Sequence, residues 1–576
     1  MTLSASFQIG RSALTASQLA IQVAGQNMAN AATAGHSRQV ARIVSVGSGV
    51  GAGVVNTGRG VQVIEVKRQI DTALQSRLED SISREQAALV DQQILSQIES
   101  IINELSDTDL SSEMTRFFNA FSELANNPSA TETRAVAIEQ GVVLASYLRG
   151  LNADLNSMRE QIDAQLATRI NKADEILREL ASVNDAVVAS EQGVGNANEL
   201  RDRRDMLVSE LSQLIDVTTI EQPNGAMDIL VGSTPILLAG TSRGLGFRQE
   251  AVDGEIRAVV YVKQTDQQLN LTTGSIGAFL QQREKNVNGV IQDLNALASN
   301  LIFEVNRLHT SGSPVAALTD LTGDLPVPLA DRALALNDPA NATFARLPFS
   351  AGNGAFNVVV SDSAGNRTIT RIEVDLDGID NAGLQGFGDD TSLEDIRDAL
   401  SAIPNLNAEI TSSGRLRVYT DSGFEVSFGD DSSGALAVLG VNTYFSGTNA
   451  ANIDVRADLQ GQPLKLAAGF SRSTNEVALA ISALRDKGVP GLGGLSLRNS
   501  WLATVERVGV EGAAANTRVA STQLVRESLE AQRGGISGVS IDEESLNLLS
   551  FQRQYQGAAR FISVVDEMLQ TLIALV

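Results

Sequence analysis

Residues 541–576 read IDEESLNLLSFQRQYQGAARFISVVDEMLQTLIALV, and the rest of the chain is organised around this stretch. Apolar side chains recur in it at alternating spacings of three and four residues: Leu548, Phe551, Tyr555, Ala558, Ile562, Val565, Leu569, Leu572 and Val576. Such spacing places one apolar stripe along a helix that packs against another helix. We therefore predict a long helix here whose stripe requires a partner.

The first thirty residues carry a matching stripe. Large apolar residues recur in it every seven positions, at Phe7, Leu14, Ile21 and Met28. Smaller residues lie between them at the complementary heptad position, at Gly10, Ser17 and Ala24. Neither terminal stripe has a partner within its own segment. We expect the terminal helices, 1–34 and 541–576, to be mobile in a monomer and to form an α-helical coiled-coil core in an assembly.

Composition excludes several classes of function. A length of 576 residues suggests about three or four domains at roughly 150 residues each. A net charge of -24 disfavours the basic surface that nucleic acid binding needs. The chain has no cysteine and only two histidines, His36 and His309, so thiolate catalysis and Cys- or His-rich metal sites lack their residues. We expect no enzyme activity, no cofactor and no metal.

Two membrane signals are also missing from the sequence. No stretch approaches the ~20 consecutive apolar residues that span a bilayer. The N-terminal region has no basic segment followed by a continuous apolar one, so a cleaved signal peptide is not expected.

Proline breaks helices, and all eleven prolines lie between Pro128 and Pro490, which favours long helices towards both ends. The opening helix is expected to stop near Ala29, before a run rich in Asn, Ala and Gly. Apolar periodicity predicts further helices over 71–104, 131–188, 198–214, 275–309, 475–484 and 501–530. The glycines of 534–538 are expected to form a hinge before the tail helix.

Period-two patterns predict strands at 39–66 and a small β unit at about 216–272. Between about 313 and 464, many Gly- and Asn-rich turns separate short strands. The sequence therefore predicts an α+β multidomain fold with a discontinuous layout. Its parts are the terminal helices, a mainly long-helix domain (35–312 and 465–540), and an inserted β-rich outer domain (313–464) of one module or two.

Four residues of the β-rich stretch resemble part of a calcium-binding loop: Asp375, Asp377, Gly378 and Asp380. The ligand order of an EF-hand and its terminal Glu are missing. An acidic turn without metal is therefore the favoured interpretation.

Residues 13–39, ALTASQLAIQVAGQNMANAATAGHSRQ, resemble the opening of the bacterial flagellar rod and hook axial proteins. The pattern of that family is Ala-Leu, a heptad helix, and then Asn-x-Ala-Asn-x-x-Thr-x-Gly-aromatic-Ser-Arg. The motif is matched here at Asn27, Ala29, Asn30, Thr33, Gly35, Ser37 and Arg38. His36 departs from the Tyr that is usual in the family.

Residues 538–573 are similar to the closing helix of the same family. The long helical region from Gln69 and the stretch NELRDRRDMLVSELSQLIDV at 198–217 indicate its hook-associated members. The resemblance spans most of the chain, and it is sharpest at the two ends.

The resemblance implies a structural protein of the bacterial flagellum that forms the junction between hook and filament by axial self-assembly through its terminal helices. The implied partners are other copies in a helical ring, the hook protein, a second hook-associated junction protein, and an export chaperone on the C-terminal helix, with no nucleic acid and no membrane insertion. It also implies type III export without a cleaved signal peptide and an extracellular location. The assembly interface is expected at Phe7, Leu14, Ile21, Met28, Leu548, Phe551, Tyr555, Ile562, Val565, Leu569 and Leu572.

Two alternatives stay open at this point. Hook and distal rod proteins share the terminal motifs, although the extended helical region before residue 215 argues against them. A type III secreted translocator or adhesin with membrane-active helices is the other alternative, but Asp566 and Glu567 within the apolar tail argue against insertion.

Overall fold

The structure is a computed structural model that describes residues 3–47, 58–104, 108–192, 195–252, 255–380 and 382–574. The last position of the tail stripe, Val576, lies outside these residues. The chain forms two compact units. Unit 1 comprises Met1–Ile94, Gln161–Glu284 and Gly512–Val576, and unit 2 comprises Leu95–Glu160 and Lys285–Glu511.

Three long helices contribute to both units, because the unit borders fall inside them. They are α2 (Thr72–Ile102), α4 (Thr131–Glu191) and α13 (Leu497–Ser537). The predicted helices 71–104 and 131–188 are thereby confirmed within a few residues. The length of α4, 61 residues, agrees with the absence of proline between its ends.

Unit 1 is built from helices and small antiparallel sheets. Besides parts of the three long helices, its elements are α1 (Leu3–Ala29), β1 (Gln39–Ser45), β2 (Val61–Arg68), α5 (Asn198–Leu214), β3 (Thr218–Glu221), β4 (Met227–Val231), β5 (Thr234–Leu238), β6 (Thr241–Ser242), β7 (Leu245–Val252), β8 (Glu255–Val262), α6 (Gly274–Gln282) and α14 (Ile541–Ala574). The sheets are β1-β2, β3-β4-β5-β6 and β7-β8. The strands expected at 39–66 and 216–272, and the helix end at Ala29, are confirmed.

Unit 2 carries the β-rich stretch. Its further elements are α3 (Leu110–Asn126), α7 (Asn288–Thr310), β9 (Asp320–Thr322), α8 (Ala342–Ala345), β10 (Gly354–Asp362), β11 (Arg367–Val374), α9 (Leu393–Ser401), β12 (Leu406–Ile410), β13 (Leu416–Thr420), β14 (Phe424–Gly429), α10 (Ala435–Leu439), β15 (Phe445–Ser446), β16 (Asp454–Val455), α11 (Ala457–Gly461) and α12 (Glu476–Ala483). Two antiparallel sheets have three strands each, β11-β10-β14 and β12-β13-β9, and β15-β16 form a third.

One cluster of buried apolar side chains joins the two larger sheets of unit 2. It contains Val358 of β10, Val418 of β13 and Ile396 of α9, all fully buried. Alternating burial along β10 shows why the period-two pattern appears in the sequence, since one face of the strand points into this cluster. The shared cluster favours one module for this stretch.

The β-rich stretch is held to the helices of unit 2 by aromatic packing and by one asparagine. Phe117 and Phe121 of α3 meet the ring of Tyr444 edge to face, with centroids 5.9 and 5.5 Å apart. Asn306 of α7 accepts hydrogen bonds from the amides of Tyr444 (3.0 Å) and Phe445 (2.8 Å). The side chains of α3 that make helical periodicity visible in the sequence are therefore core residues.

Two expectations about helix continuity need refinement. The predicted helix 275–309 is confirmed as a continuous helical stretch, but a π-helical turn at Arg283–Val287 lies within it, between α6 and α7. Within the expected hinge 534–538, Gly534 and Gly535 lie inside α13, which continues to Ser537, and the break before α14 begins only at Gly538. Each glycine costs a helix only about 1 kcal/mol, so a long helix can continue through two of them. Among the described residues, no helix is both long and apolar enough to cross a membrane.

Candidate assembly interface

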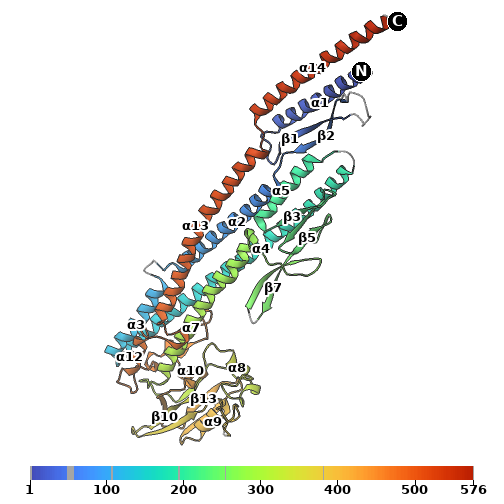
Figure 1. The fold of residues 1–576 in the computed structure, drawn as a ribbon. Helices are drawn as coiled ribbons and strands as arrows, with labels where there is room; N and C mark the ends of the chain where they lie inside the picture. The colour runs from blue at the N-terminus through green and yellow to red at the C-terminus, as the bar shows by residue number, and fades with distance from the viewer. Residues whose placement is uncertain are drawn as a thin grey trace. The chain divides into compact units, whose positions relative to one another are not determined.

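The two terminal helices pack against each other within unit 1, as Figure 1 shows for α1 and α14. They run antiparallel, since Gly10 near the start of α1 faces Ile562 near the end of α14, while Asn27 contacts Glu544 near its start. The tail stripe was predicted to pack against another helix, and in the structure that helix is the N-terminal helix of the same chain.

The buried side of α1 is a line of mainly small residues: Gly10, Ala16, Ser17, Ala20, Val23, Ala24 and Asn27. Small side chains let two helix backbones approach closely. At Gly10 the approach is tight, because a Cβ atom there would lie only 2.6 Å from Cγ1 of Ile562 and 3.0 Å from Cδ1 of Phe561. Any larger residue at this position would push α14 away.

The large residues predicted for the interface on α1 lie beside this line. Leu14, Ile21 and Met28 are half-buried, and Phe7 is 40% exposed. The small residues at the complementary heptad position are buried instead, and Gly10 among them lies against Ile562 and Phe561 of α14. The contact within the chain therefore leaves much of the predicted α1 stripe accessible.

The predicted residues of the tail are covered to different degrees. Val565 is buried, at 4% exposure, whereas Leu548, Phe551, Ile562 and Leu569 are half-buried. Tyr555 and Leu572 are 40% and 48% exposed. One helix, α1, is too narrow to cover the whole stripe.

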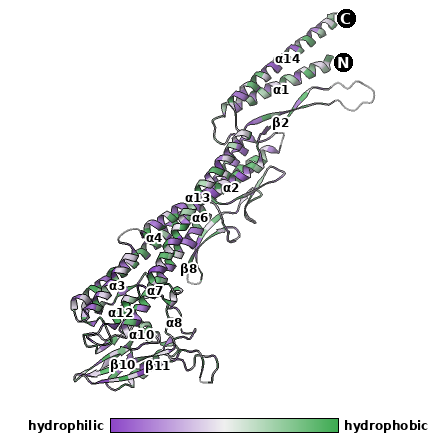
Figure 2. Cartoon of the chain, turned by 60° about the vertical axis from the view of Figure 1, so that its left-hand side comes forward, coloured by the Kyte–Doolittle hydropathy of each residue, from purple (hydrophilic) through white to green (hydrophobic). Residues whose placement is uncertain are grey.

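Further apolar side chains of α14 point to solvent, and the sequence analysis did not identify them. They are Ile541, Leu546, Leu549, Phe561, Val564, Met568 and Ile573, of which Ile573 is 73% exposed. Figure 2 shows hydrophobic residues recurring along the length of this helix. A helix that is apolar on more than one side is normally covered on more than one side, so the width of its apolar face was the signal that could have revealed them.

The turn after α1 is locked to the start of α14 by Asn27, which is 1% exposed. Its side-chain amide donates to the backbone oxygen of Gln39 (2.8 Å) and to Oε2 of Glu544 (3.1 Å). Its Oδ1 accepts from the amide of Gln39 at 3.0 Å. One buried side chain of α1 thus satisfies polar groups of β1 and α14.

Arg38 makes a second connection to α14. Its guanidinium bonds Glu544 at 2.8–2.9 Å and Glu543 at 3.2 Å, while its backbone amide donates to the oxygen of Ser537. Glu544 is only 3% exposed, so its charge requires this partner. Arg38 and Asn27, which the sequence analysis singled out only by resemblance, are therefore brought together on one carboxylate.

The other motif residues shape the turn and dock it on α5. Asn30 and Thr33 bond each other, with Thr33 Oγ1 3.3 Å from Asn30 Oδ1. Gly35 has φ of +82°, a left-handed conformation that glycine adopts without strain. The amide of Ser37 donates to Asp202 of α5 at 3.2 Å, and Nδ1 of His36 lies 3.7 Å from the same carboxylate. Ala29 is exposed at the end of α1.

The hairpin β1-β2 lies against α1, and a mostly apolar hollow of about 480 Å³ opens between it and the terminal helices. Its lining includes Ala13 of α1, Ile43 of β1, Val61 of β2 and Gly557 of α14. Apolar side chains and small residues dominate it, which suits packing of another apolar surface better than binding of a polar ligand.

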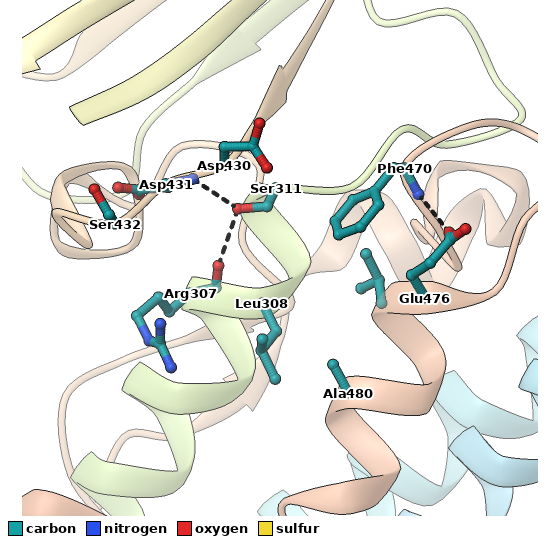
Figure 3. Close-up of a pocket in the computed structure, with 10 residues that line it drawn as sticks. Arg307, Leu308, Ser311, Asp430, Asp431, Ser432, Phe470, Glu476 and Ala480 are labelled. Atoms are coloured by element: carbon teal, nitrogen blue, oxygen red, sulfur yellow. Dashed lines mark hydrogen bonds between the residues drawn. The ribbon is translucent and has the colours of Figure 1, made fainter. Parts of the chain in front are cut away.

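A different hollow of about 340 Å³ lies in unit 2 beside α7 and α12, shown in Figure 3. Its polar groups are used by the protein itself. Ser311 Oγ accepts from the amide of Asp431 at 3.3 Å and donates to the oxygen of Arg307, and the amide of Phe470 donates to Glu476 at 3.1 Å. These groups do not converge on a ligand position, so we do not assign this hollow a function.

The two histidines are the only residues that could supply a catalytic imidazole, and both rings contact groups of the protein itself. His309 is fully buried, with Nδ1 2.8 Å from the oxygen of Asn442 and Nε2 accepting from the amide of Ala467 at 3.0 Å. Burial lowers the pKa of His309 to about 4, so the ring is neutral at physiological pH.

Two family models match the chain. The model described as the flagellar hook-associated protein FlgK helical domain matches residues 95–325. The model described as the flagellar basal body rod FlgEFG protein C-terminal matches residues 535–575, which contain α14. The second match falls on the helix that carries the exposed apolar residues.

Curated relatives align over almost the whole chain. Flagellar hook-associated protein 1 of Escherichia coli (strain K12) is 25% identical over 589 aligned residues, covering 98% of each chain. The protein of the same name from Bacillus subtilis (strain 168) is 26% identical, covering 98% of this chain and 97% of the relative. Among solved structures, the flagellar hook junction protein FlgK from Burkholderia pseudomallei matches with a TM-score of 0.48 and 14% identity, over 81% of this chain and 100% of that one.

Proposed function

This chain belongs to the flagellar hook-associated protein 1 family, and from that premise we propose that it forms the junction between hook and filament by axial self-assembly. The observation that carries the proposal is the uncovered apolar face of α14. Each large apolar side chain left in water forfeits roughly 1.5–3 kcal/mol, so a helix that exposes nine of them needs a further partner.

The interface that we propose combines the exposed residues of α14 with the large residues beside the small-residue line of α1. Equivalent helices of neighbouring copies would cover both, with α1 and α14 of each copy remaining paired. Asn27 and Arg38 hold the pair in register, because they bond the first turns of α14. The proposed partners are further copies of the chain in a helical ring, the hook protein on one side and the second hook-associated junction protein on the other.

Before assembly, the same apolar face has to be kept from aggregating. We infer that an export chaperone covers α14 in the cytoplasm, and that the chain leaves the cell through the flagellar type III apparatus without a cleaved signal peptide. The terminal segments 1–34 and 541–576 are expected to exchange amide hydrogens rapidly in the monomer and to become protected in the assembly. We propose no catalytic role.

The proposed face is tested by substitutions that remove exposed apolar side chains without disturbing the core. Leu549→Gln and Val564→Gln, at 52% and 53% exposure, are paired with Ser550→Gln and Ser563→Gln, exposed neighbours on the same helix. Each variant is introduced into a strain that lacks the chain, and filaments per hook are counted by electron microscopy. We expect bare hooks and shed flagellin with the apolar variants, and filaments with the serine variants.

Normal filaments on hooks that contain the double variant Leu549→Gln/Val564→Gln would refute this interface. The strain that lacks the chain tests the place in the flagellum separately. Complete hooks together with free flagellin support a junction protein. The loss of hooks would instead make the chain a hook or distal rod protein.

A further inference from the structure

Three carboxylates converge in the β-rich part of unit 2. Asp375 follows β11, Asp377 comes two residues later, and Asp390 lies just before α9. One oxygen from each carboxylate lies within 4.8 Å of the oxygens of the other two. In the part of the chain that the structure describes, no Lys or Arg forms an ion pair within 4.0 Å with any of the three.

The spacing of these oxygens fits one shared cation. Ca²⁺ binds oxygen at about 2.3–2.6 Å, so two ligands on opposite sides of the ion lie about 5 Å apart. Oxygens that all lie within 4.8 Å of one another can therefore contact a single Ca²⁺ without a large movement of the chain.

Buried acceptor oxygens provide the second observation. Asp390 is only 4% exposed, and its Oδ2 accepts from Nδ2 of Asn337 (2.6 Å) and from the amide of Gly378 (3.1 Å). Among the residues that the structure describes, none donates a hydrogen bond to the buried Oδ1 of Asp390, and none donates to the buried Oδ1 of Asn337 or of Asp389. Burying an acceptor without a partner is costly, and all of these atoms are oxygens, which only a donor or a cation can satisfy.

The structure also changes the candidate ligands. Asp380, which the sequence pattern included, uses its Oδ1 to accept from the amides of Ala382 (2.9 Å) and Leu384 (2.8 Å), as a turn residue does. Asp390, fifteen positions after Asp375, takes its place in the cluster. The ligand order is thus unlike that of an EF-hand, which is why sequence comparison with such a loop fails.

From this geometry we propose that unit 2 binds one Ca²⁺ through Asp375, Asp377 and Asp390, and that the ion satisfies the buried Oδ1 of Asp390. The donor set contains only oxygen, which selects a hard cation over zinc or copper. We assign Ca²⁺ rather than Mg²⁺, because Ca²⁺ accepts flexible arrangements of oxygen ligands whereas Mg²⁺ demands near-ideal octahedral geometry. The ion joins the end of β11 to the start of α9.

Isothermal titration calorimetry with the full chain, stripped with EDTA and titrated with CaCl2 or MgCl2, tests the site. We expect one Ca²⁺ per chain with a Kd of about 10⁻⁴–10⁻³ M, as in extracellular modules, and weaker Mg²⁺ binding. Asp375→Asn and Asp377→Asn change exposed residues, so folding should persist, and circular dichroism checks this. Each should weaken Ca²⁺ binding at least tenfold.

Asp380→Asn is the matched control, because it removes the same charge from the same loop while an asparagine oxygen can still accept the two turn bonds. It should bind Ca²⁺ as the unchanged chain does. The proposal is overturned if no binding is detected at about 10 mM CaCl2, well above the expected Kd. Equal weakening in Asp380→Asn, or Mg²⁺ binding as tight as Ca²⁺ binding, would overturn it as well.

Discussion

His309 makes the stability of unit 2 depend on pH in a way that can be measured. Because the amide of Ala467 donates to Nε2, the single proton of the neutral ring must reside on Nδ1, which donates to the oxygen of Asn442. A second proton would break the bond to Ala467 and place a charge in a fully buried position. Burial therefore lowers the pKa of His309 from 6.5 to about 4.

The sign and the size of the effect follow from proton linkage. Between pH 6.5 and about 4, the unfolded chain binds a proton at this residue and the folded chain does not, so acid favours unfolding. A shift from 6.5 to about 4 corresponds to a loss of about 2 kcal/mol at about pH 5 and about 3 kcal/mol at about pH 4, relative to about pH 8. The contribution is fully present above pH 6.5.

The only tryptophan supplies the assay. Trp501 is 1% exposed in unit 2, and its Nε1 donates to Glu104 at 2.8 Å, so its fluorescence reports unfolding of this unit. Urea unfolding is measured at about pH 8 and about pH 5 for the unchanged chain and for His309→Gln, which cannot titrate. His36→Gln serves as the control histidine. We expect the unchanged chain and the control to lose about 2 kcal/mol more than His309→Gln over this range.

An equal loss of stability in His309→Gln would refute this reasoning, because the pH dependence would then arise from other groups. Disappearance of the loss in His36→Gln would refute it too, because that histidine lies in unit 1.

Two further substitutions test packing and burial in the long helices. Gly141→Ala should destabilise unit 2 by about 1–3 kcal/mol, because its Cβ would overlap the hydroxyl of Tyr444. Gly150→Ala, the control on the same helix, meets nothing within 4 Å and should stabilise the chain by up to about 1 kcal/mol. Equal urea midpoints of the two variants would contradict this prediction. Burial raises the pKa of Glu79 to about 7, so its contribution to stability is present below pH 4.5 and is lost as pH rises through 7. Glu79→Gln should therefore be more stable than the unchanged chain by about 3 kcal/mol at about pH 8. Thermal unfolding followed by circular dichroism measures this, and a lower melting temperature of the variant would contradict the raised pKa of Glu79.

Local pattern predicted the elements well. The period of apolar residues and the placement of proline correctly indicated α2, α4, α5 and the tail helix, and the run after Ala29 correctly ended α1. These features depend on neighbouring residues, since helical spacing and turn chemistry act within a few positions. The same local rules did not indicate the π-helical turn at Arg283–Val287 or the continuation of α13 through Gly534.

By itself, the sequence determined that the terminal segments are amphipathic helices that need partners. Only the tertiary structure decided which side of each is covered: the small-residue line of α1 is buried, and its Gly10 lies against Ile562 and Phe561 of α14. Tertiary packing of β11 and α9 likewise brings Asp390 close to Asp375 and Asp377, which are distant from it in sequence. Periodicity records which faces are apolar, but the pairing of residues far apart in sequence depends on the shape of both surfaces, which no local pattern encodes.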